Sequence, residues 1–480
     1  MKKVLVFDFG ASSARAMLCC YNGKRIVSHE IHRFANKPVT VLGKLCWDID
    51  NLFKEVKKAI SKAGDFDAVS VDTWGVDFAL MNKMGEFVEK PVHYRDERTK
   101  GVPEKVWEII GEKELYKRTG IQFMRFNTIY QLYSVKTEAP ELFELADHLL
   151  MMPDVICNYL TGEFKNEYTE ATTTQLINPV TRDWDWELID RLGFPQKLFG
   201  EIIKPGDVYG YLKPEFCGKE VPVIAAPSHD TASAVVAIPA EEKDFAFISC
   251  GTWTLFGTEL EEAIPTEEAM AYGLTNEGGY GNTTTFLKNI MGMWLIQECK
   301  RYYQEKGDMF TYDQLEVFAK SAVSVGAFIN PNAEDFAEPG NMPEKIQRYC
   351  ERTGQPVPKS VGQILRVIYE SLSFEFARTL NGIEKITGKT YPTVYMFGGG
   401  SKDALLCRLT ANATGRTVCA GPSEATAEGN SISALIKLGE IADVPAARSI
   451  MRNSGCTKIY EPDGMDDRAE RLDKYISTAI

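Results

Sequence analysis

Residues 4–15 form the segment that most constrains the fold of this chain. Their sequence, VLVFDFGASSAR, is an apolar strand that delivers one carboxylate, Asp8, into a turn of small residues. A similar pattern of strand, small residues and strand returns in the second half, at residues 245–257. Small residues let backbone N–H groups and hydroxyls approach phosphate oxygens, because no bulky side chain intervenes. Either segment alone also fits an ordinary hairpin, but the pair favours a nucleotide clamped between two similar domains.

The length of the chain favours two domains, because single hydrophobic cores stop growing well below 480 residues. The formal net charge of −13 argues against nucleic acid or an anionic membrane as the main partner. It leaves room for a nucleotide, whose Mg²⁺ and local N–H donors supply positive charge. No apolar run approaches the roughly 20 residues of a membrane span, and too few apolar residues follow Lys2 and Lys3 for an export signal. The 11 cysteines form no Cys-x-x-Cys pair, which favours reduced thiols in the cytoplasm.

Strand-like and helix-like segments alternate in both halves, which predicts layered α/β domains. Asp50 fits the N-cap of a helix, and residues 361–386 have strong helical periodicity with Gly388 as the C-cap. The expected strands are 3–9, 16–21, 68–71, 221–226 and 393–397, and the other expected helices are 232–238 and 402–413. A polar connector after Pro239 predicts a domain boundary there, which gives the domains 1–240 and 241–480.

Two glycine-containing segments resemble phosphate motifs without matching them. Residues 354–360 are one residue short of a Walker A loop and carry Pro358 where the glycine before the lysine belongs, so we reject that motif. The triplet Gly398–Gly400 follows a strand, but the third glycine of a dinucleotide fingerprint would fall at Asp403. The triplet fits a close approach to a nucleotide better, with a purely structural turn as the alternative.

The sequence His229-Asp230-Thr231 follows an expected strand, at the end where α/β sheets place their ligands. Asp230 could cap the helix that follows. The alternative is a base that accepts a hydroxyl proton during phosphoryl transfer, since an alcohol becomes acidic only as its bond to phosphorus forms. His229 would then bind substrate or support the turn.

A set of polar and aromatic residues fits the recognition of a polyhydroxylated ligand, because rings stack on C–H faces while charged groups bind hydroxyls. This polar-aromatic set comprises Trp47-Asp48, residues 73–78 and residues 94–98. Its structural alternative is buried tryptophans beside an Arg–Asp bridge. In residues 287–297, Asn289 and Gln297 would share one face of a helix, with Met291, Met293 and Trp294 in the core.

Together these motifs resemble the FGGY carbohydrate kinases, within the actin/hexokinase/Hsp70 ATPase superfamily. The resemblance covers nearly the whole chain, and the motif set is specific although each motif alone is general. It rests on DFGASS at 8–13, DTWGVDF at 72–78, YRDERT at 94–99, ATTTQL at 171–176, HDTASAV at 229–235, GTW at 251–253, NEGG at 276–279 and GGGS at 398–401. The resemblance implies two RNase-H-like domains of the actin-like ATPase type. Each would be a five-stranded mixed sheet flanked by helices, with the active site in the cleft between the domains.

The resemblance also implies ATP- and Mg²⁺-dependent phosphorylation of L-rhamnulose at its 1-hydroxyl. Asp230 would be the catalytic base, and Asp8 would lie near the metal. The ATP-binding residues would be Ala11, Ser12, Ser13, Ala14, Arg15, Thr252, Gln297, Gly399 and Gly400. The sugar-binding residues would be Gly75, His229, Asp230, Thr231 and Asn289. The first domain would hold sugar and phosphate, and the second would hold ATP.

Two residues depart from the pattern of the family. Ala14 stands where the family commonly has glycine, and an alanine would cost free energy or shift the loop if that position needs a positive φ. Cys250 stands where serine is frequent, so no hydroxyl is present there. Neither departure touches Asp230.

Three other functions stay open at this point. A kinase for another ketose, such as L-fuculose or D-xylulose, would share these motifs, because sugar epimers differ only in the placement of hydroxyls. An actin-like nucleotide switch without transfer activity is disfavoured by the polar-aromatic set and by Asp230. A dehydrogenase would rest on the glycine triplet alone.

Overall fold

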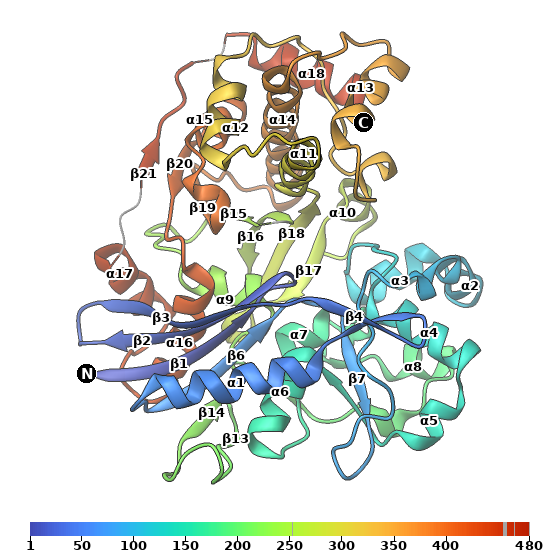
Figure 1. Cartoon of the computed structure of the whole chain (residues 1–480), viewed down its shortest axis with the longest axis vertical. Coiled ribbons are helices and arrows are strands. Elements are labelled where there is room, and N and C mark those ends of the chain that lie inside the picture. The colour runs from blue at the N-terminus through green and yellow to red at the C-terminus, as the bar shows by residue number, and fades with distance from the viewer. Residues whose placement is uncertain (252, 455–457, 465, 480) are drawn as a thin grey trace. The chain divides into compact units, whose positions relative to one another are not determined.

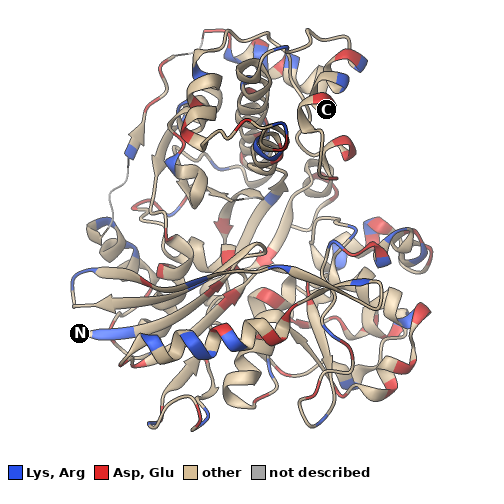
Figure 2. Ribbon diagram, viewed as in Figure 1, with Lys and Arg blue, Asp and Glu red and all other residues tan. Residues whose placement is uncertain are grey.

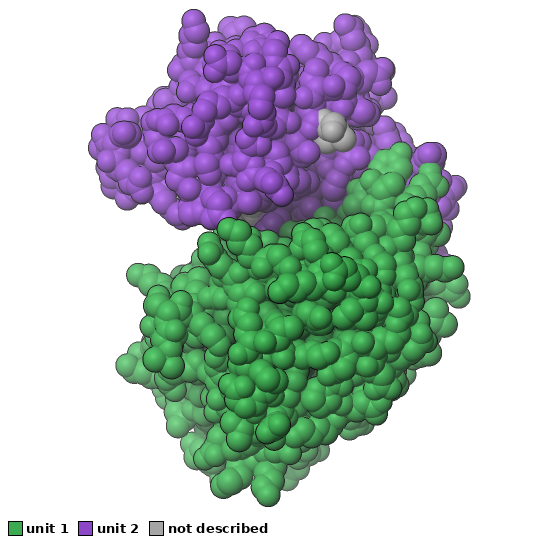
Figure 3. All heavy atoms as spheres, turned by 90° about the vertical axis from the view of Figure 1, so that its right-hand side faces the viewer, with its two compact units in different colours: residues 1–241, 259–286, 424–454 green, residues 242–258, 287–423, 455–480 purple. Residues whose placement is uncertain are grey.

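The structure is a computed structural model that describes residues 1–251, 253–454, 458–464 and 466–479. Its backbone forms two compact units, which are coloured separately in Figure 3. Unit 1 comprises Met1–Glu241, Glu259–Phe286 and Glu424–Ser454, and unit 2 comprises Glu242–Thr258, Leu287–Ser423 and Gly455–Ile480. Each unit is therefore built from separated stretches of chain, whereas the domains 1–240 and 241–480 remain a prediction about continuous halves.

Unit 1 is built on a six-stranded mixed sheet with the order β13-β14-β6-β1-β2-β3 (Figure 1). Strand β1 pairs antiparallel with β2 and parallel with β6, and β14 is also parallel to β6. The strands are β1 (Lys2–Phe9), β2 (Ser13–Tyr21), β3 (Ile26–Ala35), β6 (Ala68–Thr73), β13 (Val208–Tyr211) and β14 (Pro222–Ile224). Residues 4–9 of β1 are all buried, as a central strand with both faces covered requires.

Helices cover both faces of this sheet. On one face, Leu5, Phe7 and Phe9 of β1 share a hydrophobic core with residues of α1 (Ile49–Ala63) and α6 (Met152–Thr161). The other face contacts α16 (Ala425–Lys437), which packs on α9 (Asp230–Val236). Side chains alternate along a strand, so Asp8, which lies between Phe7 and Phe9, faces α16.

Helix α1 confirms the expected apolar stripe but begins at a different cap. Its N-cap is Asp48, whose side chain accepts a hydrogen bond from the backbone N–H of Asn51. Asp50 lies inside the first turn, so the prediction that Asp50 caps the helix is wrong by two residues. The stripe residues Leu52, Val56 and Ile60 are buried. The exposed lysines of α1 stand out in Figure 2 and are Lys54, Lys57, Lys58 and Lys62.

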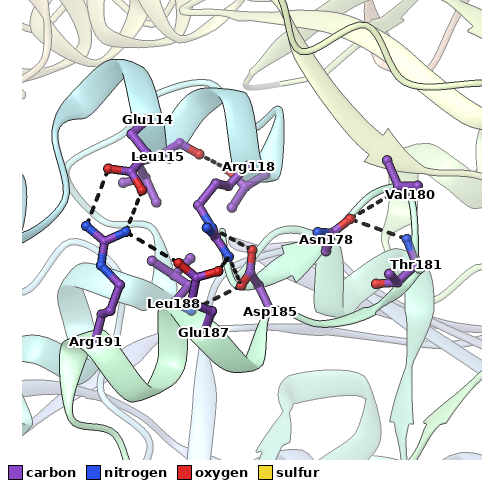
Figure 4. A network of polar contacts seen from close by, with 11 residues as sticks. Glu114, Leu115, Arg118, Asn178, Val180, Thr181, Asp185, Glu187, Leu188 and Arg191 are labelled. Atoms are coloured by element: carbon purple, nitrogen blue, oxygen red, sulfur yellow. Dashed lines mark hydrogen bonds and ion pairs between the residues drawn. The ribbon is translucent and has the colours of Figure 1, made fainter.

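The segment between β6 and β14 adds a part with a hydrophobic core of its own. Its elements are β7 (Phe78–Met81), α2 (Val102–Ile109), α3 (Glu112–Thr119), α4 (Thr128–Glu138), α5 (Glu141–Leu145), β8 (His148–Met151), β9 (Asn166–Glu167), α7 (Tyr168–Thr172), β10 (Ile177–Asn178), β11 (Asp183–Trp184), α8 (Trp186–Leu192) and β12 (Ile202–Ile203). Figure 4 shows the ion pairs that join α3 to α8. Arg118 donates to both oxygens of Asp185, at 2.9 and 2.6 Å, and Arg191 pairs with Glu114. Asp185 also caps α8, because it accepts from the N–H of Leu188.

Unit 2 repeats the sheet of unit 1. This second sheet has seven strands in the order β17-β18-β16-β15-β19-β20-β21, where β17 is Thr275–Gly278. Strand β15 is antiparallel to β16 and parallel to β19. The strands are β15 (Ala246–Cys250), β16 (Thr254–Leu260), β18 (Thr284–Ile290), β19 (Thr393–Phe397), β20 (Thr417–Ala420) and β21 (Lys458–Tyr460). The hairpin β1–β2 thus corresponds to β15–β16, and the parallel strands β6 and β14 correspond to β19 and β20.

This correspondence confirms the α/β prediction of two similar domains, each a mixed sheet flanked by helices. The expected number of five strands is wrong, because the first sheet has six strands and the second has seven. In unit 1 β13 pairs antiparallel with β14, and in unit 2 β21 pairs antiparallel with β20.

The main helix of unit 2 is α14 (Val361–Thr387), as its periodicity predicted. Ser360 caps it by accepting from the N–H of Gln363, and Gly388 ends it in the left-handed conformation. The rejected Walker A segment therefore ends in a helix cap. The expected strand 393–397 is β19, and the expected helix 402–413 is α15 (Ala404–Thr414).

The remaining elements complete the two units. They are β4 (Pro38–Val41), β5 (Lys44–Trp47), α10 (Glu267–Tyr272), β17 (Thr275–Gly278), α11 (Trp294–Glu305), α12 (Tyr312–Ser321), α13 (Met342–Arg352), α17 (Val444–Ser454) and α18 (Arg468–Ala479). Within the described ranges, no helix has the length and hydropathy needed to cross a membrane.

Unit 2 contains a buried ion pair between β18 and α14. The Nζ of Lys288 lies 2.7 Å from Oε1 of Glu375, which is fully buried. Arg378 and the hydroxyl of Tyr475 in α18 also donate to Glu375. Burial alone would raise the pKa of Glu375, but Lys288 and Arg378 outweigh it and lower this pKa to about 2.

In unit 1, α16 approaches α9 closely at Gly429. A Cβ atom built on Gly429 would lie 1.8 Å from the carbonyl oxygen of Ser233 and 2.7 Å from its carbonyl carbon. Only glycine permits this separation of the two helices, because a methyl group there would overlap the backbone of α9.

We predict that Gly429→Ala lowers the free energy of unfolding by about 1–3 kcal/mol, because the helices must move apart to accept the methyl group. Urea denaturation followed by circular dichroism measures this change. Gly218→Ala is the matched control, since a Cβ there would meet no atom within 4 Å. Equal stability of the two variants would contradict the close approach.

We predict that Lys288→Met lowers the free energy of unfolding by about 3 kcal/mol, because it leaves a buried carboxylate short of one partner. The depressed pKa of Glu375 stabilises the folded state above the ordinary value of 4.5, and this contribution is lost as the pH falls through about 2. The difference in the free energy of unfolding between wild type and variant should therefore shrink as the pH falls from 4.5 to about 2. Lys320→Met, at an exposed site in α12, is the control and should change stability by less than about 0.5 kcal/mol.

Candidate active site

Three neighbouring strands of unit 1 place Asp72, Asp8 and Arg15 in a row. Asp8 on β1 is in register with Asp72 on the parallel strand β6 and with Arg15 on the antiparallel strand β2. The guanidinium of Arg15 donates to Oδ2 of Asp8 and to Oε2 of Glu424, the residue before α16. The row is therefore partly neutralised by one arginine that pairs with two carboxylates.

Asp72 is the most buried carboxyl group of this row, with no exposed surface. Its Oδ2 accepts a hydrogen bond of 2.5 Å from the side-chain amide of Asn430 in α16. Burial, together with the charges of Asp8 and Asp230, raises the pKa of Asp72 well above its ordinary value. Burial and the neighbouring carboxylates therefore favour the neutral form of Asp72.

The predicted phosphate turn links β1 to β2. The N–H of Gly10 donates to the carbonyl of Ser13 at 2.9 Å, and the side chain of Asn36 donates to the carbonyl of Gly10 at 3.0 Å. Ser12 and Ser13 are exposed, so their hydroxyls and backbone are accessible to a ligand. Ala14 is fully buried in β2, paired with strand neighbours on both sides. The position is extended strand, so the condition of a positive φ, under which alanine would cost free energy or shift the loop, is not met at Ala14.

Asp230 is the first residue of α9 and projects from the end of the segment that follows β14. The N-cap is His229, and the structure gives Asp230 no capping hydrogen bond, so the helix-cap interpretation of Asp230 is wrong. Its side chain is 37% exposed and accepts from the hydroxyl of Thr231 at 3.1 Å. Burial of the site raises the pKa of Asp230, His229 lowers it and Asp8 raises it further.

His229 lies between two carboxylates. Its Nδ1 is 3.2 Å from Oε2 of Glu277 in β17, and its Nε2 is 3.7 Å from Oδ1 of Asp230. Burial alone would lower the pKa of His229, but Glu277 and Asp230 outweigh it and raise this pKa to about 8. His229 is therefore largely cationic at neutral pH. Glu277 was not among the predicted site residues, although it belongs to the motif at 276–279.

Three further carboxyl groups are buried next to this segment. Glu167 accepts from the N–H groups of Thr169, Glu170 and Ser228, and burial raises its pKa to about 7. Burial also raises the pKa of Asp154 and of Glu170 well above their ordinary values. Neither oxygen of Glu170 has a hydrogen-bond partner within the described residues. The sequence offered no periodic signal for these acids.

The polar-aromatic set gathers around Asp77. Oδ2 of Asp77 accepts from the indoles of Trp47, at 2.7 Å, and Trp74, at 3.1 Å, and from the N–H of Tyr94. Oδ1 accepts from the amide of Gln131 at 3.1 Å. Asp77 and both indoles are buried, so the structural alternative of buried tryptophans describes this cluster. Burial raises the pKa of Asp77 to about 6.

Gly75 lies at the edge of this cluster and is partly exposed. A Cβ on Gly75 would lie 3.0 Å from Cγ2 of Thr173, and the N–H of Val76 donates to the hydroxyl of Thr173. The segment at Gly75 therefore packs on the end of α7. The hydroxyl of Thr169, in the same helix, accepts from the N–H of His229, so α7 contacts both the Gly75 segment and the His229 segment.

The other predicted site residues lie in unit 2. Asn289 belongs to β18 and Gln297 to α11, so the prediction that they share one helix is wrong. The chain turns between them at Gly292, where a Cβ would lie 1.8 Å from the hydroxyl of Thr254. Met291 is buried, whereas Met293 and Trp294 are only partly so. Thr252 lies outside the described residues.

The glycine triplet follows β19 and packs against the end of β15. Gly398 has a φ of 79°, and a Cβ on Gly400 would lie 2.1 Å from Sγ of Cys250. Gly399 is exposed, so its backbone is open to a ligand. Asp403, where a dinucleotide fingerprint needs glycine, caps α15 instead by accepting from the N–H of Leu406. Cys250 is buried, and burial raises its pKa to about 12.

The next feature of the site is its capacity to hold a metal ion. Among the described residues, no group of three or more His, Cys, Asp and Glu side chains is arranged to hold a metal ion. Magnesium bound to a nucleotide needs fewer protein ligands, since it commonly takes one or two carboxylates and completes its shell with phosphates and waters. Asp8 suits that smaller role.

Comparisons with known proteins identify the family of this chain. The sequence model of the FGGY family of carbohydrate kinases matches residues 3–237 with its N-terminal domain and residues 246–438 with its C-terminal domain. A rhamnulokinase of Oceanobacillus iheyensis is 41% identical over 457 residues, which is 94% of this chain and 96% of that protein. A rhamnulokinase of Halalkalibacterium halodurans is also 41% identical, over 96% of this chain and 99% of that protein.

Solved structures share the fold. The ligand-bound xylulose kinase from Lactobacillus acidophilus superposes with a TM-score of 0.80 at 17% identity, over 100% of this chain and 96% of that one. The Plasmodium falciparum glycerol kinase with ADP superposes with a TM-score of 0.77 at 15% identity, over 100% and 99% of the two chains. The predicted fold, two α/β domains of the actin-like ATPase type, is thereby confirmed. The chain belongs to the FGGY family of carbohydrate kinases.

Proposed function

We propose that this kinase transfers the γ-phosphoryl group of ATP to the 1-hydroxyl of L-rhamnulose, which gives L-rhamnulose 1-phosphate for L-rhamnose catabolism. The similarity to proteins named rhamnulokinase over nearly the full length of both chains carries the proposal. The net charge of −13 favours a small sugar and a nucleotide over nucleic acid or a membrane as partners. A cytoplasmic location would supply the ATP.

Asp230 is the proposed catalytic base. It accepts the proton of the sugar hydroxyl as the oxygen–phosphorus bond forms and as the bond from the γ-phosphorus to its bridging oxygen breaks. The products are ADP and the sugar 1-phosphate, and Asp230 then releases its proton to solvent. Two observations support this role. The side chain is partly exposed, so a substrate can reach it, and its raised pKa makes it a stronger base than an ordinary aspartate.

Asp8 is the residue that we assign to Mg²⁺. Its carboxylate lies near the end of β1, which leads into the exposed turn Ser12–Ser13, and Arg15 donates to its Oδ2. Bound Mg²⁺ would neutralise charge on the β- and γ-phosphates.

The remaining assignments follow the family motifs. For ATP we propose Ala11, Ser12, Ser13, Ala14, Arg15, Thr252, Gln297, Gly399 and Gly400, and for the sugar Gly75, His229, Asp230, Thr231 and Asn289. Ala14 would act through its backbone, because its side chain is buried. The exposure of Ser12, Ser13 and Gly399 supports their part in this set.

We predict that Asp230→Asn lowers kcat by about 10³-fold, because the amide cannot accept the proton. The affinity for ATP, measured by calorimetry, should stay within about two-fold, since no ATP contact is assigned to this residue. Asp65→Asn, at a side chain that is 90% exposed, is the matched control and should keep full activity. Wild-type turnover in Asp230→Asn would exclude this residue as the base.

We predict that kcat/KM, measured by coupled ADP release, is highest for L-rhamnulose in a panel with L-fuculose and D-xylulose. A preference of at least about 10-fold is expected, because a misplaced hydroxyl leaves polar groups of the site unpaired. A higher value for another ketose would support the alternative kinase. ADP release that no sugar stimulates would instead support a nucleotide switch without transfer activity.

A further inference from the structure

We propose that Glu277 is a positioning residue that holds the imidazole of His229 against the catalytic base, in a relay Glu277–His229–Asp230. The relay rests on the proposed function, because it assigns Asp230 as the base. It adds a residue from β17 to the site, one that lies in the motif at 276–279 but was not among the predicted site residues.

The imidazole of His229 lies between two carboxylates. Both ring nitrogens face a carboxylate, since Nδ1 lies 3.2 Å from Glu277 and Nε2 lies 3.7 Å from Asp230. The backbone of His229 is fixed as well. Its N–H donates to the hydroxyl of Thr169, and it forms a parallel bridge with Thr73 at the end of β6. The side chain is only 11% exposed, so water cannot replace either carboxylate freely.

Glu277 is itself held in place by its strand. The N–H of Gly278 donates to the hydroxyl of Thr172 at 2.9 Å, and a Cβ on Gly278 would lie 2.7 Å from the ring of Tyr168. On its other side, Asn276 donates from its backbone and its side chain to the carbonyl of Gly120. Strand β17 is therefore anchored to α7 and to the end of α3, and the carboxylate of Glu277 is aimed by rigid elements.

The charges around the relay explain why Asp230 needs a cationic neighbour to stay ionised. Acidic groups approach from every neighbouring element: Asp8 on β1, Asp72 on β6, Glu167 on β9, Glu170 on α7 and Glu277 on β17. The guanidinium of Arg15 is already paired with Asp8 and Glu424. The cation that lowers the pKa of Asp230 is His229, whereas Asp8 raises it. Glu277 keeps His229 protonated, and His229 in turn keeps Asp230 ionised and ready to accept a proton.

The test is Glu277→Gln, which keeps the size of the side chain and removes its charge. The pKa of the His229 imidazole, followed by NMR of ¹⁵N-histidine protein, should fall from about 8 to below its ordinary value of 6.5. A His229→Gln sample assigns the resonance among the five histidines. The acidic limb of the profile of kcat against pH should move up by about one pH unit, because Asp230 loses its cationic neighbour. The KM for ATP should not change.

Two controls separate positioning from a merely structural role. Glu277→Asp should restore part of the wild-type profile, and Glu259→Gln, which alters a carboxylate paired with Arg448 away from His229, should leave the profile unchanged. In a His229→Gln background, Glu277→Gln should add no further shift, since the two residues act as one unit.

An unchanged His229 pKa in Glu277→Gln, or the same additional shift in the His229→Gln background, would overturn the relay. The NMR titration does not depend on turnover. A protein that fails to phosphorylate any ketose but shows the expected His229 shift would therefore refute the proposed function and leave the contact between Glu277 and His229 intact.

Discussion

The register between three strands is the constraint on which the site depends. A parallel pair, β1 and β6, and an antiparallel pair, β1 and β2, share one central strand, so Asp72, Asp8 and Arg15 must lie side by side. A slip of one residue in β1 would turn Asp8 to the opposite face, among Leu5, Phe7 and the core of α1. The register of β1 with its two neighbouring strands therefore fixes the place of the carboxylate.

Unit 1 treats its buried acids in two different ways. Asp77 is satisfied by two indoles, an amide and a backbone N–H, so it fixes the shape of an aromatic cluster. Glu170 has no such donors, and burial beside other carboxyls favours its neutral form. Some acids near Asp230 are thus stabilised by hydrogen-bond donors, whereas burial favours the neutral form of others.

The sequence predicted the architecture well because its signals were local. The periodicity of residues 361–386, the glycine at 388 and the repeated strand-and-turn segments each report on neighbouring residues, and the structure places all of them as expected. The prediction of one helix for residues 287–297 failed because Gly292 packs against Thr254, a contact that sequence spacing does not contain. The cap of α1 was misplaced by two residues for a different reason, since Asp48 and Asp50 are both suitable cap residues next to the start of the helix.

The site itself was predictable only in part. Asp8, His229 and Asp230 belong to local motifs, and the register of the sheet brings Asp8 close enough to affect Asp230. Glu277, Glu424 and Asn430 come from distant stretches, so no motif near Asp230 could reveal them. The free-energy cost that a positive φ would impose on Ala14 does not arise, because Ala14 is a strand residue paired with β1 and β3.

The helix that carries Gly429 has a consequence for how the protein is made. Unit 1 obtains Glu424, Gly429 and Asn430 only after the chain has passed through residues 287–423 of unit 2. On the ribosome, the nascent N-terminal part emerges long before α16 does, and until then Asp72 lacks Asn430 and α9 lacks the helix that packs on it. A chain cut short before residue 424 therefore contains Asp8, Arg15 and Asp230 but cannot complete their surroundings. Translation past residue 430 is therefore a condition for completing the surroundings of the proposed catalytic base.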